Sequence, residues 1–141
     1  MSLSPEICLR GVLDMLQTRI APALTDSYAA EGSRLAGLVL TIVANGIDDA
    51  AAIRIAENEA LRALFRDVAA DVADAGLAAA GSAAGSGYRL SELDADNARL
   101  RATLVDLHAA VEDQPGEPAR AIDHRIWRML RDFEVARAPR R

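Results

Sequence analysis

The two histidines are the residues of this chain best suited to metal binding or acid–base chemistry. His108 is followed four residues later by Glu112, and this spacing places both side chains on one face of a helix. His124 directly follows Asp123. Neither histidine has the Glu-x-x-His or His-Glu-x-x-His spacing of helical metal sites. We therefore expect no metal site and no catalytic residue, and we expect His108 to pair with Glu112.

The other reactive groups form no catalytic pattern. Most acidic residues, Glu57 and Glu59 among them, lie beside or opposite apolar stripes, which is typical of a solvated helix face. The segment 81–87 lacks the lysine and the preceding strand of a phosphate-binding loop. Cys8 is the only cysteine, so the chain cannot form an intrachain disulfide, and a reducing, cytoplasmic setting is expected. The prediction is a protein without a cofactor.

Charge and hydropathy argue against two classes of partner. The formal net charge of −5 does not favour nucleic acid as a partner of the whole chain. The longest apolar stretch, Leu35–Ala44, is too short to cross a bilayer, and residues 1–10 lack an apolar signal core. Neither nucleic acid nor a membrane is therefore expected as a partner.

The elements that would position these residues are predicted to be helices. Hydrophobic residues make up 51% of the chain, many of them alanine, and aromatic residues only 4%. Alanine is the best helix former and adds little core volume, so this composition favours closely packed helices. The clearest pattern lies in 91–113, where apolar residues and one asparagine alternate at four- and three-residue spacing. Its members are Leu93, Asn97, Leu100, Leu104, Leu107 and Val111.

Further stripes predict an all-α, antiparallel bundle of four to five helices in a single domain, 1–141. Pro22 interrupts the first helical segment, and a kink there is favoured over a helix end. A third helix is expected from about 49 to 75, followed by a flexible Gly/Ala/Ser tether at about 76–88. Ser91 is expected to cap the next helix, and a last helix is expected after Glu117.

A short segment occurs twice in the chain. Residues 57–63, ENEALRA, match residues 96–102, DNARLRA. Duplication of a helical unit and convergence on good helix sequence both explain the match. In each copy an asparagine, Asn58 or Asn97, falls on the apolar stripe. It could lie at a solvated end of the stripe, set helix register, or contact a polar ligand. If it sets register, Asn97→Leu should raise thermal stability and loosen the oligomeric state.

Three functions follow from these patterns. The first is a non-enzymatic interaction module that forms a homo-oligomer, a dimer being the simplest, or docks on a partner enzyme. Its predicted interface residues are Leu100, Leu104, Trp127 and Leu130. The second is a bundle with an apolar core pocket that binds an acyl or aromatic group, with polar contacts from Asn58, Asn97 or His108. The third is an enzyme acting through His108 or His124 with a nearby carboxylate.

Several short motifs resemble those of a protein group. Residues 8–11 (CLRG), 44–50 (ANGIDDA), 107–108 and 126–127 are similar to segments of a group of uncharacterised small all-helical bacterial proteins. The group is associated with genes for phosphotransferase-like and acyl-CoA-metabolising enzymes. The resemblance implies an accessory role beside such enzymes, and it implies no role for any particular residue.

Overall fold

The computed structural model describes residues 3–85 and 87–138, which form six α-helices and contain no strand. The all-α prediction is therefore confirmed. The described chain forms two compact units, residues 3–50 (unit 1) and residues 51–138 (unit 2). Organisation as a single domain over 1–141 stays a prediction.

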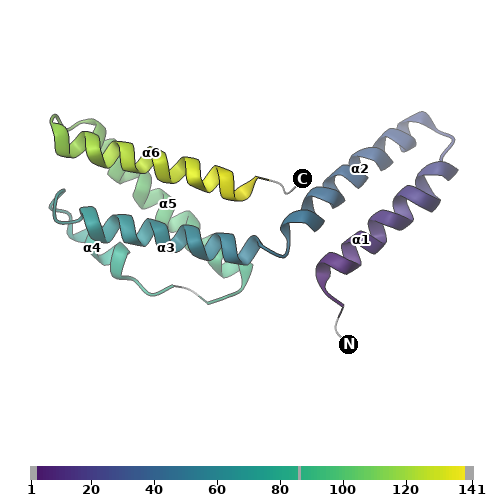
Figure 1. Cartoon of the computed structure of the whole chain (residues 1–141), viewed down its shortest axis with the longest axis horizontal. Helices are drawn as coiled ribbons and strands as arrows, with labels where there is room; N and C mark the ends of the chain where they lie inside the picture. Colours follow the sequence, from purple (N-terminus) through teal and green to yellow (C-terminus); the bar gives the residue numbers. More distant parts are fainter. Residues whose placement is uncertain (1–2, 86, 139–141) are drawn as a thin grey trace. The chain divides into compact units, whose positions relative to one another are not determined.

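Unit 1 is a hairpin of two antiparallel helices, α1 (Pro5–Met15) and α2 (Ser27–Gly46) (Figure 1). Two short turns of altered helical geometry, Leu16–Ile20 and Ala21–Ala23, continue α1. At Leu24 the backbone becomes extended, with ψ at 120°. The favoured kink at Pro22 is therefore wrong, because the helical segment ends at Ala23, one residue after the proline.

Local sequence features explain where the first helical segment ends and where α2 begins. Pro22 has no backbone N–H and its ring crowds the preceding turn, so a regular helix cannot continue through it. The carboxylate of Asp26 then accepts a hydrogen bond from the backbone N–H of Ala29 at 2.7 Å, which starts α2. Ser4 caps α1 in the same way, through a 3.3 Å bond from Ile7 N.

Unit 1 encloses very little of its own apolar surface. Of the described residues in its helices, only Gly37 and Ala44 are buried. Leu13 and Leu16 of the first helical segment approach Gly37, where the missing side chain lets the two helices come close. The two helices of the hairpin therefore touch along one line of contact and bury almost no side chains between them.

Unit 2 contains α3 (Ala50–Val68) except for its first residue, together with α4 (Ala75–Ser82), α5 (Leu90–Glu112) and α6 (Glu117–Arg137). Its core cluster is built from all four helices: Leu61, Leu64, Phe65, Val68, Leu77, Leu100, Leu104, Leu107, Val111, Ala119, Ile122, Ile126 and Phe133. The helices expected after residue 91 and after Glu117 are thus observed. The cap of α5 differs from the prediction, because the carboxylate of Glu92, and not Ser91, accepts a bond from Arg89 N at 3.2 Å.

The predicted tether is partly a helix. The helix α3 ends at Val68 rather than near residue 75, and Ala73 takes a left-handed conformation with φ at 53°. Asp74 then caps α4 by accepting from the N–H groups of Gly76 and Leu77. Glycine at position 81 lets α4 lie against α3, since an added Cβ would be 2.8 Å from the backbone N of Arg66. The small residues of this segment, which were predicted to form a linker, therefore form a surface that packs against α3.

The helices α3 and α5 run in the same direction (Figure 1), as alternate helices do in a bundle whose consecutive helices are antiparallel. Residue pairs Glu57–Arg137 and Asp67–Arg125 show that α3 is antiparallel to α6. Pairs Arg101–Phe133 and His108–Asp123 show the same for α5. The helix α4 carries the chain back along α3, as the bonds from Arg66 to the carbonyl of Gly81 and from Arg62 to the carbonyl of Ala83 show. Consecutive helices of unit 2 are therefore antiparallel, as predicted.

Candidate functional site

The two asparagines of the repeated segment meet at the centre of unit 2. Asn58 on α3 and Asn97 on α5 are 2% and 4% exposed. Nδ2 of Asn97 donates to Oδ1 of Asn58 at 2.7 Å, and Nδ2 of Asn58 donates to the carbonyl of Leu93 at 3.1 Å. Of the three interpretations of these asparagines, this geometry is that of a register-setting contact within the chain.

Glu57, beside Asn58, is a buried carboxylate surrounded by arginines. Arg137 from α6 donates to both of its oxygens, at 2.5 and 2.6 Å. Arg54 and Asn97 donate to Oε2 at 2.9 and 3.2 Å, and a guanidinium nitrogen of Arg101 lies 3.7 Å from the same oxygen. With Glu57 only 2% exposed, the expected solvated face is wrong at this position.

Asp96 makes the corresponding contacts from the second copy of the segment. Its Oδ2 accepts from Arg62 at 2.6 Å and from Nδ2 of Asn58 at 3.4 Å. Arg62 also donates to the carbonyl of Ala83 at 2.9 Å, which ties the chain after α4 to the same network. Each acidic residue therefore contacts the asparagine and the arginine of the other copy.

This reciprocity is the pattern of a parallel coiled coil. In such a pair, polar residues at facing core positions form hydrogen bonds to each other. Charged residues beside the core of one helix form ion pairs with oppositely charged residues one turn further along the other helix. The asparagines occupy the facing core position, and Glu57–Arg101 and Asp96–Arg62 occupy the flanking positions. The sequence repeat thus has a structural counterpart, whether it arose by duplication or by convergence.

The electrostatics of the network keep Glu57 ionised. Burial opposes the charged form, but the hydrogen bonds and charges of Arg137 and Arg54 outweigh it and hold the pKa of Glu57 below its ordinary value of 4.5. The hydrogen bonds to Glu57 in turn raise the pKa of Arg137. A carboxylate held in this state is suited to fixing three helices together and poorly suited to proton transfer.

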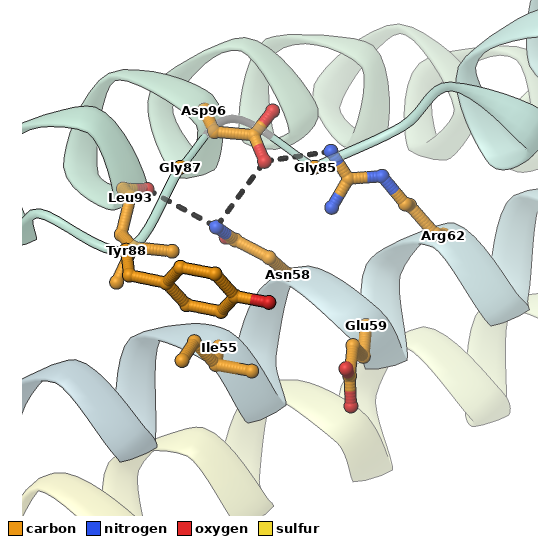
Figure 2. A pocket seen from close by; sticks show the side chains of 9 residues that line it. All are labelled: Ile55, Asn58, Glu59, Arg62, Gly85, Gly87, Tyr88, Leu93 and Asp96. Carbon is orange, nitrogen blue, oxygen red and sulfur yellow. Dashed lines mark hydrogen bonds and ion pairs between the residues drawn. The ribbon is translucent and has the colours of Figure 1, made fainter.

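A pocket of about 310 Å³ lies beside this network (Figure 2). Asn58, Arg62 and Asp96 form its inner wall, and Ile55 and Glu59 extend it along α3. Its other lining residues are Leu93 and the loop residues Gly85, Gly87 and Tyr88. The pocket is lined by polar and apolar groups alike, and thus differs from the apolar core pocket that was predicted.

The remaining predicted site residues lie on different parts of unit 2. Leu100 and Leu104, predicted as interface residues, are each 5% exposed and belong to the core cluster of unit 2. Trp127 is 57% exposed and Leu130 is partly buried against the core cluster. His108 is bonded through Nε2 to Asp123 at 2.8 Å, and Oε1 of Glu112, its expected partner, is 3.7 Å away. Asp123 was missed because it comes from the next helix.

A scan against protein-family models, a search of curated proteins and a search of solved structures each found no match. The resemblance to small bacterial helical proteins therefore stays a prediction. Among the described helices, none alone is long and apolar enough to span a membrane; α2 and α3 together pass that test by length and composition only, across a bend.

Proposed function

We propose that this chain is a non-enzymatic helical interaction module that self-associates through α2. The observation that carries the proposal is a row of large apolar side chains on the surface of this helix, each 49–62% exposed. The row, called here the α2 stripe, consists of Leu35, Leu38, Val39 and Ile42. Their spacing of three and four residues places them on one face of the helix.

The stripe is apolar surface that unit 1 cannot cover by itself. Exposed apolar residues scattered singly are ordinary, but a contiguous row is typical of an interaction site. Large side chains on α1 are exposed as well, among them Ile7, Val12 and Met15 at 49–58%. A two-helix hairpin with so little interior gains most by packing against further helices.

A second copy of the chain is the partner that the stripe fits best. The stripe itself holds no charged residue, and the charged residues that precede it, Glu31 and Arg34, are paired with each other. Two such stripes facing across a two-fold axis would place four helices around one apolar core, which is the geometry of a four-helix bundle. An apolar, self-complementary face supports association of like with like.

Light scattering across a dilution series tests the proposal. We expect a mass twice that of the 15.0 kDa chain, and we expect Leu38→Glu to reduce it to the monomer because a charge would be placed in the apolar contact. The matched control is Val105→Glu, which alters a residue of similar exposure, 67%, on α5. A wild-type monomer at every concentration, or a dimer that survives Leu38→Glu, would contradict the proposal.

A small-molecule site is the second candidate, and the pocket beside Asn58 is the observation that favours it. Its volume lies at the lower end of the range for ligand pockets. The ring of Tyr88 offers a flat surface and Ile55 an apolar one, whereas Arg62 and Asp96 would set charge against an acyl chain. An aromatic group therefore fits better. A thermal-shift series of aromatic compounds, with Tyr88→Ala as the variant, tests this candidate. Equal shifts for the variant and the wild type would remove it.

A further inference from the structure

We propose that His108, Glu112 and Asp123 bind a divalent transition-metal ion between α5 and α6. Nε2 of His108 lies 2.8 Å from Oδ1 of Asp123 and 3.7 Å from Oε1 of Glu112. One donor atom from each of the three side chains lies within 4.8 Å of the other two. The site belongs to neither the buried network nor the α2 stripe.

The distances fit the coordination geometry of such an ion. Zinc binds histidine nitrogen and carboxylate oxygen at about 2.0–2.2 Å, so neighbouring donors of a tetrahedral site lie roughly 3.3 Å apart. The two measured separations from Nε2 lie on either side of that value. Small side-chain rotations of Glu112 and Asp123 would therefore complete three protein ligands, with water at the remaining positions.

The two helices position the donors before any ion arrives. His108 and Glu112 are four residues apart on α5, and Asp123 and Trp127 are four residues apart on α6, so the two pairs face each other. The ring of Trp127 meets the imidazole edge-on, with centroids 5.5 Å apart and an interplanar angle of 78°. This contact orients the imidazole so that Nε2 faces the carboxylates, while Glu112, 64% exposed, stands at the entrance.

The donor set indicates the class of ion. Two carboxylates carry the charge that balances a dication, and an oxygen of each lies within 4 Å of Nε2 of His108. One imidazole nitrogen with two oxygens suits Zn²⁺, Ni²⁺ or Co²⁺, whereas Mg²⁺ and Ca²⁺ favour sites made of oxygen alone. Binding would displace any proton shared between Nε2 and Asp123.

The single tryptophan of the chain provides a direct readout. Untagged protein carrying Cys8→Ser, which removes the exposed thiol as a competing ligand, is titrated with NiCl₂ while Trp127 fluorescence is followed. We expect saturable quenching at one equivalent, reversed by ZnCl₂. The variant His108→Ala should bind at least about tenfold more weakly, whereas His124→Ala, the matched control, should bind like the parent protein.

A second variant covers the case in which His108→Ala fails to fold. Glu112→Gln changes only an exposed side chain, keeps its shape and should also weaken Ni²⁺ binding about tenfold or more. Far-UV circular dichroism confirms that each variant is folded. Equal affinities for His108→Ala and His124→Ala, an unchanged affinity for Glu112→Gln, or quenching that never saturates would overturn the proposal and leave a histidine–aspartate pair.

Discussion

Nδ2 of Asn97 donates to Oδ1 of Asn58 over 2.7 Å, so the two copies of the repeated segment meet at the same position in each. The contact links two parallel helices, α3 and α5, and any sliding of one along the other would break it. The amide pair therefore specifies one register, a role that apolar side chains at these positions could not perform as strictly.

Replacing one asparagine should destabilise the chain. Asn97→Leu removes the donor to Asn58 Oδ1 and one donor to Glu57, and leaving buried polar groups unpaired costs about 1–3 kcal/mol. The double variant Asn58→Leu/Asn97→Leu should recover part of this loss, because both amides are then gone. Urea unfolding of the two single variants and the double variant measures the coupling.

This expectation reverses the one drawn from the sequence, in which Asn97→Leu raises stability. The reversal follows from the number of partners that Asn97 has in the structure. A single variant more stable than the wild type, or strictly additive effects in the cycle, would show that the amide pair contributes nothing.

Glu57 should be among the least replaceable residues of unit 2. Glu57→Gln leaves Arg54, Arg101 and Arg137 facing one another around a neutral side chain, and breaking a buried ion pair on one side costs roughly 3 kcal/mol or more. The control Glu59→Gln alters an exposed acid two residues away and should change the free energy of unfolding by less than about 0.5 kcal/mol. Similar effects of both in urea unfolding would contradict the role assigned to Glu57.

The same carboxylate predicts a dependence of stability on pH. The pKa of Glu57 is lower in the folded chain than its ordinary value of 4.5, so the unfolded chain binds the proton more readily. The stabilisation is therefore complete above that ordinary value and is lost as the pH falls through the folded-state pKa. Urea unfolding between about pH 6 and pH 3 should show a steeper loss for the wild type than for Glu57→Gln. Parallel pH profiles would count against this assignment.

Gly81 should resist substitution although it lies in a stretch rich in glycine and alanine. In Gly81→Ala the new Cβ would fall 2.8 Å from Arg66 N and 3.1 Å from the carbonyl of Arg62, both of which belong to the backbone of α3. The helix α4 would have to move away, and we expect a loss of about 1–3 kcal/mol. Gly85→Ala, with nothing within 4 Å, is the control in thermal unfolding. Equal melting temperatures would show that α4 is loosely packed.

The parts of the fold that were predicted correctly depend on local signals. Apolar spacing marked α5 and α6, and Pro118 and Ser4 stand at the starts of helices where capping rules place such residues. The end of α1 was missed because a proline allows both a kink and a break, and the cap at Asp26 comes four residues later. The helix α4 was missed because its small residues are typical of linkers and form a helix through contact with α3.

The site residues show a similar division. The register role of Asn58 and Asn97 was among the interpretations of the repeat, since position on a stripe can be read from spacing. The burial of Glu57 could not be read, because its partner Arg137 lies 80 residues further along the chain. The contact of His108 with Asp123 crosses the turn between α5 and α6, and only the pairing of those helices brings the two side chains together.

The loop and helix that connect α3 to α5 make a coiled-coil pair out of one polypeptide. Two separate chains would lose such a pairing on dilution, but a covalent connection gives each helix a fixed effective concentration of the other. The midpoint of the unfolding transition in which the α3–α5 pair separates should therefore be independent of protein concentration. Any association through the α2 stripe will instead follow mass action.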